Sequence, residues 1–263
     1  MGEKSDPIRL SFNRLEKLDW WVTALFYITT VLSIIVSYCS ANNCLKESQD
    51  AIDYASIISL AIIFTSLIGF GISLYVREYK LPLVQDIRVK DNFSSAFGAS
   101  FGQERTDGYY NNPFKNPDLK VAAQTLENVY FTGEILSAVL WWKTLILALY
   151  VLIGIYVMIV ADIPKVIIAF QFLISEPVVS SWIKAVWLKL RCTEIFNYLV
   201  GIFKGKPDQD FICKSHYSFT SYEMAKSHAG IILPSKTFDK LNPELSTKWD
   251  GIIADLAQKV EDD

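Results

Sequence analysis

The chain has 263 residues, of which 51% are hydrophobic and 20% charged, and its formal net charge is −3. This composition excludes an intrinsically disordered protein, which combines low hydrophobicity with high charge. The weakly acidic balance also excludes a strongly basic module for nucleic-acid binding.

Three long charge-free runs predict helices that cross a membrane. They occupy residues 20–45, 54–76 and 144–161, and are 26, 23 and 18 residues long. A helix needs about 20 apolar residues to cross the hydrocarbon core of a bilayer. A single run of this kind also fits a buried helix of a soluble core, but three in one chain favour membrane spans.

A fourth span is predicted at residues 166–186, where two apolar halves meet at Glu176 and Pro177. An ionisable group inside a span usually faces a pore, a cavity or a partner. Pro177 leaves a backbone carbonyl one turn earlier without its helical donor, and Gln171 adds a polar group nearby. These three residues are therefore candidates for a pore or gate. The alternative is that Glu176 lies near an interface because the span is bent or re-entrant.

The distribution of cations predicts the topology. With four spans, 23 of the 25 lysines and arginines fall on one side, which indicates that both termini lie inside. We therefore expect a multi-pass membrane protein. The expected parts are a cytosolic helix start at 1–19, a transmembrane hairpin at 20–76, a cytosolic loop at 77–118, a long helix entering the third span and then the fourth span at 119–186, and a cytosolic helical region at 187–263.

The parts outside the membrane predict a small, mostly helical domain. Residues 81–120 are rich in turn-forming residues and predict an irregular loop. Asn116, Pro117 and Asp118 have the pattern of a helix start, so one long helix is expected to run from there into the third span. In the tail we expect a short helix at 221–229 and a last helix at 243–260, capped by Thr220 and Asn242. The fold class is thus an all-α integral membrane protein with four transmembrane helices and a cytosolic domain formed by the middle loop and the tail.

Polar positions within and between the spans are candidates for an ion path. Ser66, Gly69 and Ser73 form a small-residue face on the second span, which predicts close helix packing or the lining of a narrow path in an assembly of several copies. Glu47, Asp50 and Asp53 lie in or beside the first outer loop, where carboxylates favour cations at a pore mouth.

The middle loop holds the best candidates for binding a signal. Cations alternate with aromatic rings there, as they do on surfaces that contact phosphates and bases, and a solvated loop is the alternative. The candidate set is Arg88, Lys90, Arg105, Tyr109, Tyr110 and Lys115.

One motif suggests an enzyme. Residues 98–102 match G-x-S-x-G around Ser100, but this motif needs a strand–turn–helix in a parallel sheet, and the surrounding sequence predicts no buried strand. We therefore expect no catalytic residue, no metal site and no cofactor.

Four spans, two inner termini, a divided cytosolic domain and no enzymatic motif form a layout that resembles a family of bacterial effectors. These are the four-transmembrane effectors of anti-phage systems (the SMODS-associated type, in particular Hailong-type effector subunits) encoded beside nucleotidyltransferase genes. The resemblance covers the architecture of the whole chain. It implies a homo-oligomeric pore in the bacterial inner (plasma) membrane, controlled by a cytosolic nucleotide, an oligonucleotide or a nucleotidyltransferase partner. Opening of the pore would depolarise the infected cell. The alternative is a non-conducting membrane-anchored sensor or scaffold that binds a cytosolic protein.

Overall fold

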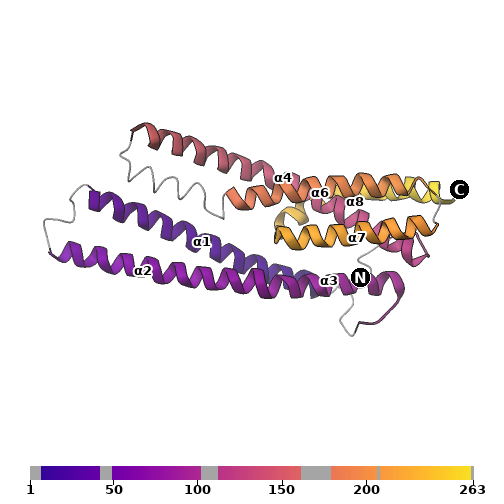
Figure 1. Cartoon of the computed structure of the whole chain (residues 1–263), viewed down its shortest axis with the longest axis horizontal. Coiled ribbons are helices and arrows are strands. Elements are labelled where there is room, and N and C mark those ends of the chain that lie inside the picture. The colour runs from indigo at the N-terminus through magenta and orange to yellow at the C-terminus, as the bar shows by residue number, and fades with distance from the viewer. Residues whose placement is uncertain (1–6, 42–48, 102–111, 161–178, 206–207, 262–263) are drawn as a thin grey trace. The chain divides into compact units, whose positions relative to one another are not determined.

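A computed structural model describes residues 7–41, 49–101, 112–160, 179–205 and 208–261, and no strand occurs in these ranges. The helices are α1 (Pro7–Ala41), α2 (Gln49–Leu74), η1 (Tyr75–Lys80), α3 (Leu81–Phe97), α4 (Pro117–Val160), α6 (Ser181–Ile202), α7 (Gln209–Ala229) and α8 (Ser235–Glu261) (Figure 1). The chain divides into two compact units, Arg9–Val84 and Gln85–Asp263, the second of which includes Met1–Ile8.

The first unit is built on α1 and α2. A Cβ atom on Gly69 of α2 would lie 3.9 Å from the Leu25 Cβ of α1, so the glycine allows the two helices to approach closely. Asp19 and Arg77 form an ion pair with 3.8 Å between Oδ1 and Nη2. The other faces of the two helices expose many large apolar side chains, among them Ile28, Val31, Ile57, Leu60, Phe64 and Leu67.

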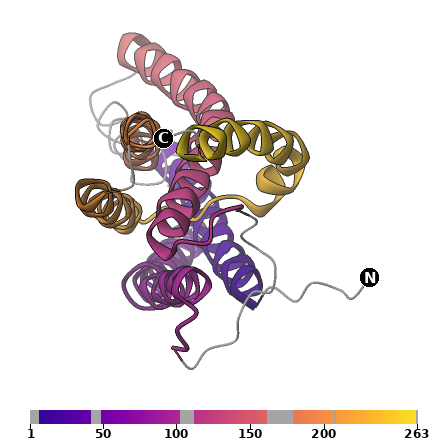
Figure 2. The same cartoon turned by 90° about the vertical axis from the view of Figure 1, so that its right-hand side faces the viewer.

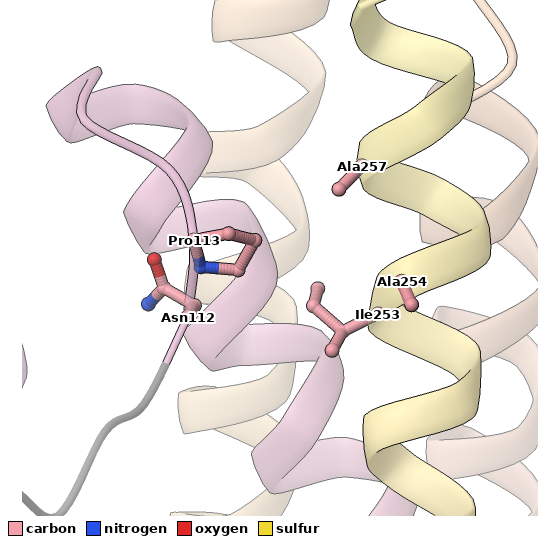
Figure 3. Close-up of a pocket in the computed structure, with 5 residues that line it drawn as sticks. All are labelled: Asn112, Pro113, Ile253, Ala254 and Ala257. Carbon is pink, nitrogen blue, oxygen red and sulfur yellow. The ribbon is translucent and has the colours of Figure 1, made fainter.

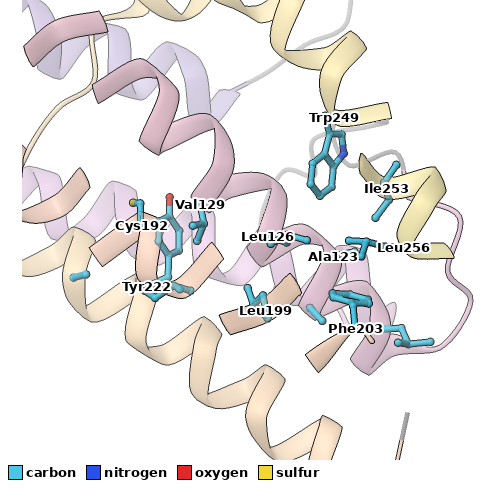
Figure 4. Close-up of a cluster of buried hydrophobic side chains, with 14 of the residues drawn as sticks. Ala123, Leu126, Val129, Cys192, Leu199, Phe203, Tyr222, Trp249, Ile253 and Leu256 are labelled. Atoms are coloured by element: carbon cyan, nitrogen blue, oxygen red, sulfur yellow. The ribbon is translucent and has the colours of Figure 1, made fainter. Parts of the chain in front are cut away.

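The second unit packs α4, α6 and α7 around one apolar core (Figure 4). α6 and α7 run side by side in Figure 1, and Figure 2 views both nearly end-on, so their axes are close to parallel. Asp208 caps α7 by accepting a hydrogen bond from the Phe211 N–H at 2.9 Å. The largest fully buried side chains of this core include Leu126, Leu136, Leu188, Leu199, Phe203 and Tyr222.

α4 is the one long helix that the sequence predicts, and its 44 residues run without a break. Asn116 caps it, because the Asn116 side-chain oxygen accepts a hydrogen bond from the Asp118 N–H at 2.8 Å. The part of α4 before Leu140 is packed into the core, whereas large apolar side chains from Trp141 onward are exposed.

Two of the described helical stretches, Ser56–Phe97 and Pro117–Tyr156, are long and apolar enough to cross a membrane. Only 6% and 0% of their most apolar segments are buried inside the protein. These stretches contain most of the second predicted span and much of the third. The first predicted span falls mostly within α1. The fourth falls largely on residues 161–178, outside the described residues, so a total of four spans stays a prediction.

The middle loop differs from the prediction. Instead of an irregular segment from residue 81, the chain continues through the π-helix η1 into α3 as far as Phe97. The turn-forming residues of α3 are held in the helix by tertiary contacts, since Asn92 and Ser94 are buried and the Phe93 ring meets Phe219 edge-on. The helix ends at Gly98, whose φ of +70° suits glycine.

Two predicted helix starts in the tail are wrong. Thr220 does not begin a helix but lies inside α7, where its hydroxyl donates to the His216 carbonyl at 2.9 Å. α8 begins at Ser235, so Asn242 and Pro243 lie within it. Proline removes one backbone hydrogen bond inside a helix and bends it, and Figure 2 shows α8 changing direction along its length. The large apolar side chains of this helix recur at helical spacing, and four of them are buried: Leu245, Trp249, Ile253 and Leu256.

Two leucine-to-alanine variants test whether α4 has a packed first part and an exposed second part. Leu126 is fully buried, whereas Leu152 is 64% exposed. We expect Leu126→Ala to lower the free energy of unfolding by about 2–5 kcal/mol, because it leaves a cavity in the core. Leu152→Ala should change it by less than about 0.5 kcal/mol. Denaturant unfolding of the detergent-solubilised chain measures both, and equal losses would contradict the division.

Candidate functional site

The helical domain, which we define as α3 from Gln85, α4 up to Leu140, and α6, α7 and α8, contains a buried polar cluster. At its centre lies Tyr222 of α7, which is 1% exposed and whose ring lies between Cys192 and Val129 in Figure 4. Its hydroxyl shares a hydrogen bond of 2.9 Å with the Thr132 hydroxyl of α4. It also donates to the Asn128 carbonyl at 3.4 Å. The tyrosine thus joins α7 to α4 inside the core.

Two cations and one carboxylate surround this ring. Arg88 of α3 forms an ion pair with Glu223 of α7, and the two side chains are only 11% and 17% exposed. The Arg88 Cζ lies 5.6 Å from the centre of the Tyr222 ring, and the Lys226 Nζ lies 5.8 Å from it. Both positions are within range of cation–π attraction. We call Arg88, Thr132, Cys192, Tyr222, Glu223 and Lys226 the polar cluster; it joins α3, α4, α6 and α7.

Burial changes the acid–base properties of the polar cluster. Burial, and to a smaller extent the nearby Arg88 guanidinium, lower the pKa of Lys226 to about 7. Burial also raises the pKa of the Cys192 thiol to about 12 and that of the Tyr222 hydroxyl above its ordinary range. The thiol and the phenol therefore stay neutral near pH 7, while Lys226 changes its charge there.

A second acid, Glu127, is half-buried where α4 meets α8. Burial, and then the neighbouring charge of Asp250, raise the pKa of Glu127 to about 7. Its Oε2 atom and the Trp249 Nε1 atom are both buried without a hydrogen-bond partner among the described residues. The Tyr130 ring stacks on Trp249 with 6.3 Å between centroids. Docking of α8 therefore covers a carboxyl group that is neutral only below about pH 7.

The predicted signal-binding residues are not gathered into one site by the described part of the structure. Arg88 lies in the polar cluster, Lys90 pairs with Asp86 at 2.6 Å, and Lys115 is exposed shortly before α4. The other three members of that set, Arg105, Tyr109 and Tyr110, lie outside the described residues.

The predicted pore residues are described only in part. Ser66 is exposed, Ser73 is half-buried, and Gly69 is buried against α1. Asp50 and Asp53 belong to the first turns of α2. The remaining candidates, Glu47, Gln171, Glu176 and Pro177, lie outside the described residues.

A shallow hollow of about 350 Å³ lies between the segment before α4 and the α8 helix (Figure 3). Pro113 and Ile253 line it, together with Asn112, Ala254 and Ala257. The two alanines leave the space open, and no charged side chain lines it. Such an open hollow lacks the convergent polar groups of a small-molecule site.

The candidate nucleophile lies outside any sheet. Ser100 is exposed in the segment that follows α3, with no strand beside it in the described ranges. His216 pairs instead with Asp118 at 3.0 Å, and the His228 ring lies edge-on to Trp187. These contacts supply no base for Ser100.

Comparisons with known proteins give no relative: no protein-family model, no curated protein sequence and no solved structure matches the chain.

Sequence reasoning missed Tyr222, Lys226 and Glu127. A signal for Lys226 exists, since it follows Tyr222 by four residues and therefore shares a helix face with it. The helix predicted at 221–229 already contains both residues, but the burial of their shared face depends on contacts with Arg88 of α3 and Thr132 of α4, which are remote in sequence. Glu127 gives no such signal, because its burial depends on α8, which is remote in sequence.

The two buried ionisable groups predict a minimum of stability near pH 7. Between about pH 4.5 and 7 the unfolded chain releases the Glu127 proton and the folded chain keeps it, so stability falls as the pH rises. Between about pH 7 and 10.5 the unfolded chain keeps the Lys226 proton and the folded chain has lost it, so stability rises again. Glu127→Gln should remove the fall in the free energy of unfolding between pH 4.5 and 7, and Lys226→Met should remove the rise between pH 7 and 10.5. Denaturant unfolding at pH 5, 7 and 9.5 measures both.

Glu134→Gln and Lys240→Met serve as matched controls, because both side chains are exposed on α4 and α8. They should leave the pH profile unchanged. A wild-type profile that is flat between pH 5 and 9.5 would contradict the burial of both groups.

Proposed function

We propose that the chain is a subunit of a homo-oligomeric membrane pore, opened by a cytosolic signal, which depolarises the bacterial inner membrane in anti-phage defence. The observation that carries the proposal is the change of surroundings along one helix. α4 passes from a core in which Leu126 is fully buried to a segment in which Leu152 is 64% exposed. The same helix therefore links a packed domain to an apolar surface that needs lipid.

The second helical stretch favours conduction over simple anchoring. The small residues of α2 differ in their surroundings. Gly69 packs on α1, whereas the hydroxyl-bearing Ser66 is exposed. An exposed hydroxyl among apolar neighbours can line a narrow path when copies of the chain associate. One pair of helices cannot enclose water, so the proposal requires several subunits.

The polar cluster is the proposed coupling element. The chain is helical from Gln49 to Phe97 through η1, so the part of α3 that carries Arg88 continues the helix of the second predicted span. α4, which carries Thr132, continues toward the third. A signal that breaks the Arg88–Glu223 pair would therefore act on helices that lead to two spans. π-Helical turns such as η1 are frequent at functional sites.

The proposed signal is a nucleotide, an oligonucleotide or a nucleotidyltransferase partner that acts on the cytosolic side. Anionic ligands suit the exposed Lys115 and the neighbouring predicted residues Arg105, Tyr109 and Tyr110. Contact with Arg88 would compete directly with Glu223. This competition gives an anionic signal a way to release α3 from α7.

Ion flux in liposomes containing the purified full chain tests the proposal. Breaking a buried ion pair leaves an unpaired charge, which costs about 3–5 kcal/mol, so Glu223→Gln should loosen the coupling and change the potassium flux at least severalfold. The matched control is Glu194→Gln, which breaks an exposed arginine–glutamate pair with Arg191 on α6 and should leave the flux unchanged. Glu176→Gln should alter the flux if this carboxyl group faces the path.

If liposomes with the wild type and with all three variants show no potassium flux, the result would contradict a pore. Together with capture of a cytosolic protein by the helical domain, that result would favour the non-conducting sensor or scaffold.

A further inference from the structure

The sequence of α3 favours turns, although the structure holds it as a helix from Leu81 to Phe97. Within residues 86–97, aspartate, asparagine and serine occupy positions 86, 91, 92, 94 and 95. Such side chains hydrogen-bond to the nearby backbone and compete with helical hydrogen bonds. Isolated helices shorter than about 12–15 residues are marginal in water even for favourable sequences. The helical state of this segment therefore depends on its contacts with α4 and α7.

Many of the contacts that hold α3 in place are polar. Asn92 is buried, and the Ser95 Oγ accepts a hydrogen bond from the Gln124 Nε2 of α4 at 3.1 Å. Arg88 forms its ion pair with Glu223 of α7. Each of these groups can exchange its protein partner for water when α3 moves away. Polar interfaces of this kind are typical of parts that separate from one another.

The apolar contacts of the same segment belong to a small cluster apart from the main core. This cluster consists of Ala96, Val121 and Phe219, with Val89 and Phe93 partly buried against it. The main core, by contrast, is shared by α4, α6, α7 and α8. Hydrophobic stabilisation grows with the apolar area that leaves water. The small cluster therefore holds α3 less firmly than the main core holds the other four helices.

Two buried amide groups oppose the docked state of α3. The Gln85 Nε2 of α3 and the Gln124 Oε1 of α4 have no hydrogen-bond partner within the part of the chain that the structure describes, and the two residues are only 7% and 1% exposed. A buried polar group without a partner costs free energy, because it has lost its hydration. Gln85 lies on α3 itself, and Gln124 contacts α3 through Ser95. Both amides therefore regain water when α3 moves away.

We propose that residues 85–97 form a latch, which leaves α4 and α7 and loses its helical structure while α4, α6 and α7 stay folded. A change between an ordered and a disordered segment is a common form of molecular switch. The latch begins where the chain passes from the first unit to the second, a few residues after η1. Its state decides whether the helix that runs from α2 through η1 ends in a docked or a free segment. The latch concerns the helical domain alone and holds whether or not the chain conducts ions.

Hydrogen–deuterium exchange of the detergent-solubilised full chain, read by mass spectrometry, tests the latch. We expect the amides of residues 88–97 to exchange about tenfold faster, or more, than the core amides near Leu199 of α6 and Tyr222 of α7. Low concentrations of denaturant should accelerate exchange of the core amides but hardly change that of the latch, because local opening exposes little surface. Exchange of the latch at the core rates, with the same dependence on denaturant, would overturn the proposal.

Two variants and a matched control identify the contacts that hold the latch. Gln85→Met keeps the length of the side chain but removes the unpartnered amide, so exchange of the latch should slow by about threefold. Phe93→Ala removes the edge-on contact with Phe219, so exchange of the latch should rise by about tenfold while the core rates stay the same. Gln258→Met on α8 is the control, since Gln258 is exposed, and it should change neither rate. Equal acceleration of the latch and the core in Phe93→Ala would overturn the proposal, because the segment would then unfold only with the whole domain.

Discussion

The structure depends on one constraint: apolar side chains must leave water, and α4 meets this requirement in two different ways along its length. Before Leu140 its apolar side chains pack against α6, α7 and α8. After that point they are exposed on the protein, and only a bilayer or other copies of the chain can cover so large an apolar surface. The packed half fixes the direction of the helix, and the exposed half needs a bilayer or other copies of the chain to cover it. The proposed pore follows from this change of surroundings.

The polar cluster makes the stability of the helical domain depend on buried charges as well as on apolar packing. Two cations, one carboxylate and a buried tyrosine hold four helices together, and Lys226 changes its charge near pH 7. Buried charges of this kind are stable only while their partners stay in place. The helical domain is therefore stable while every contact of the polar cluster is made, and the loss of one contact destabilises it. This property suits a coupling element better than a passive anchor.

Much of the helical organisation could be predicted from the sequence, because charge-free runs and helix caps are local signals. The start of α4 at Asn116 and Pro117 follows from capping chemistry, and the buried face of α8 follows from its periodicity. α3 could not be predicted, because its turn-forming residues are held in the helix by contacts with Phe219 and Glu223, more than 100 residues away. Of the polar cluster, only Arg88 was a predicted site residue. Its ion pair with Glu223 could not be predicted, because the two residues lie on helices that are remote in sequence.

The most direct test of the account is the accessibility of α4 in a bilayer. Single nitroxide labels at exposed positions of α4 between Trp141 and Ile159, on a cysteine-free full chain in liposomes, report collisions with oxygen and with a water-soluble nickel chelate. The account predicts that oxygen collisions rise and nickel collisions fall from Trp141 toward Leu152. High nickel accessibility along the whole segment would show that water, not lipid, surrounds it, and would contradict the account.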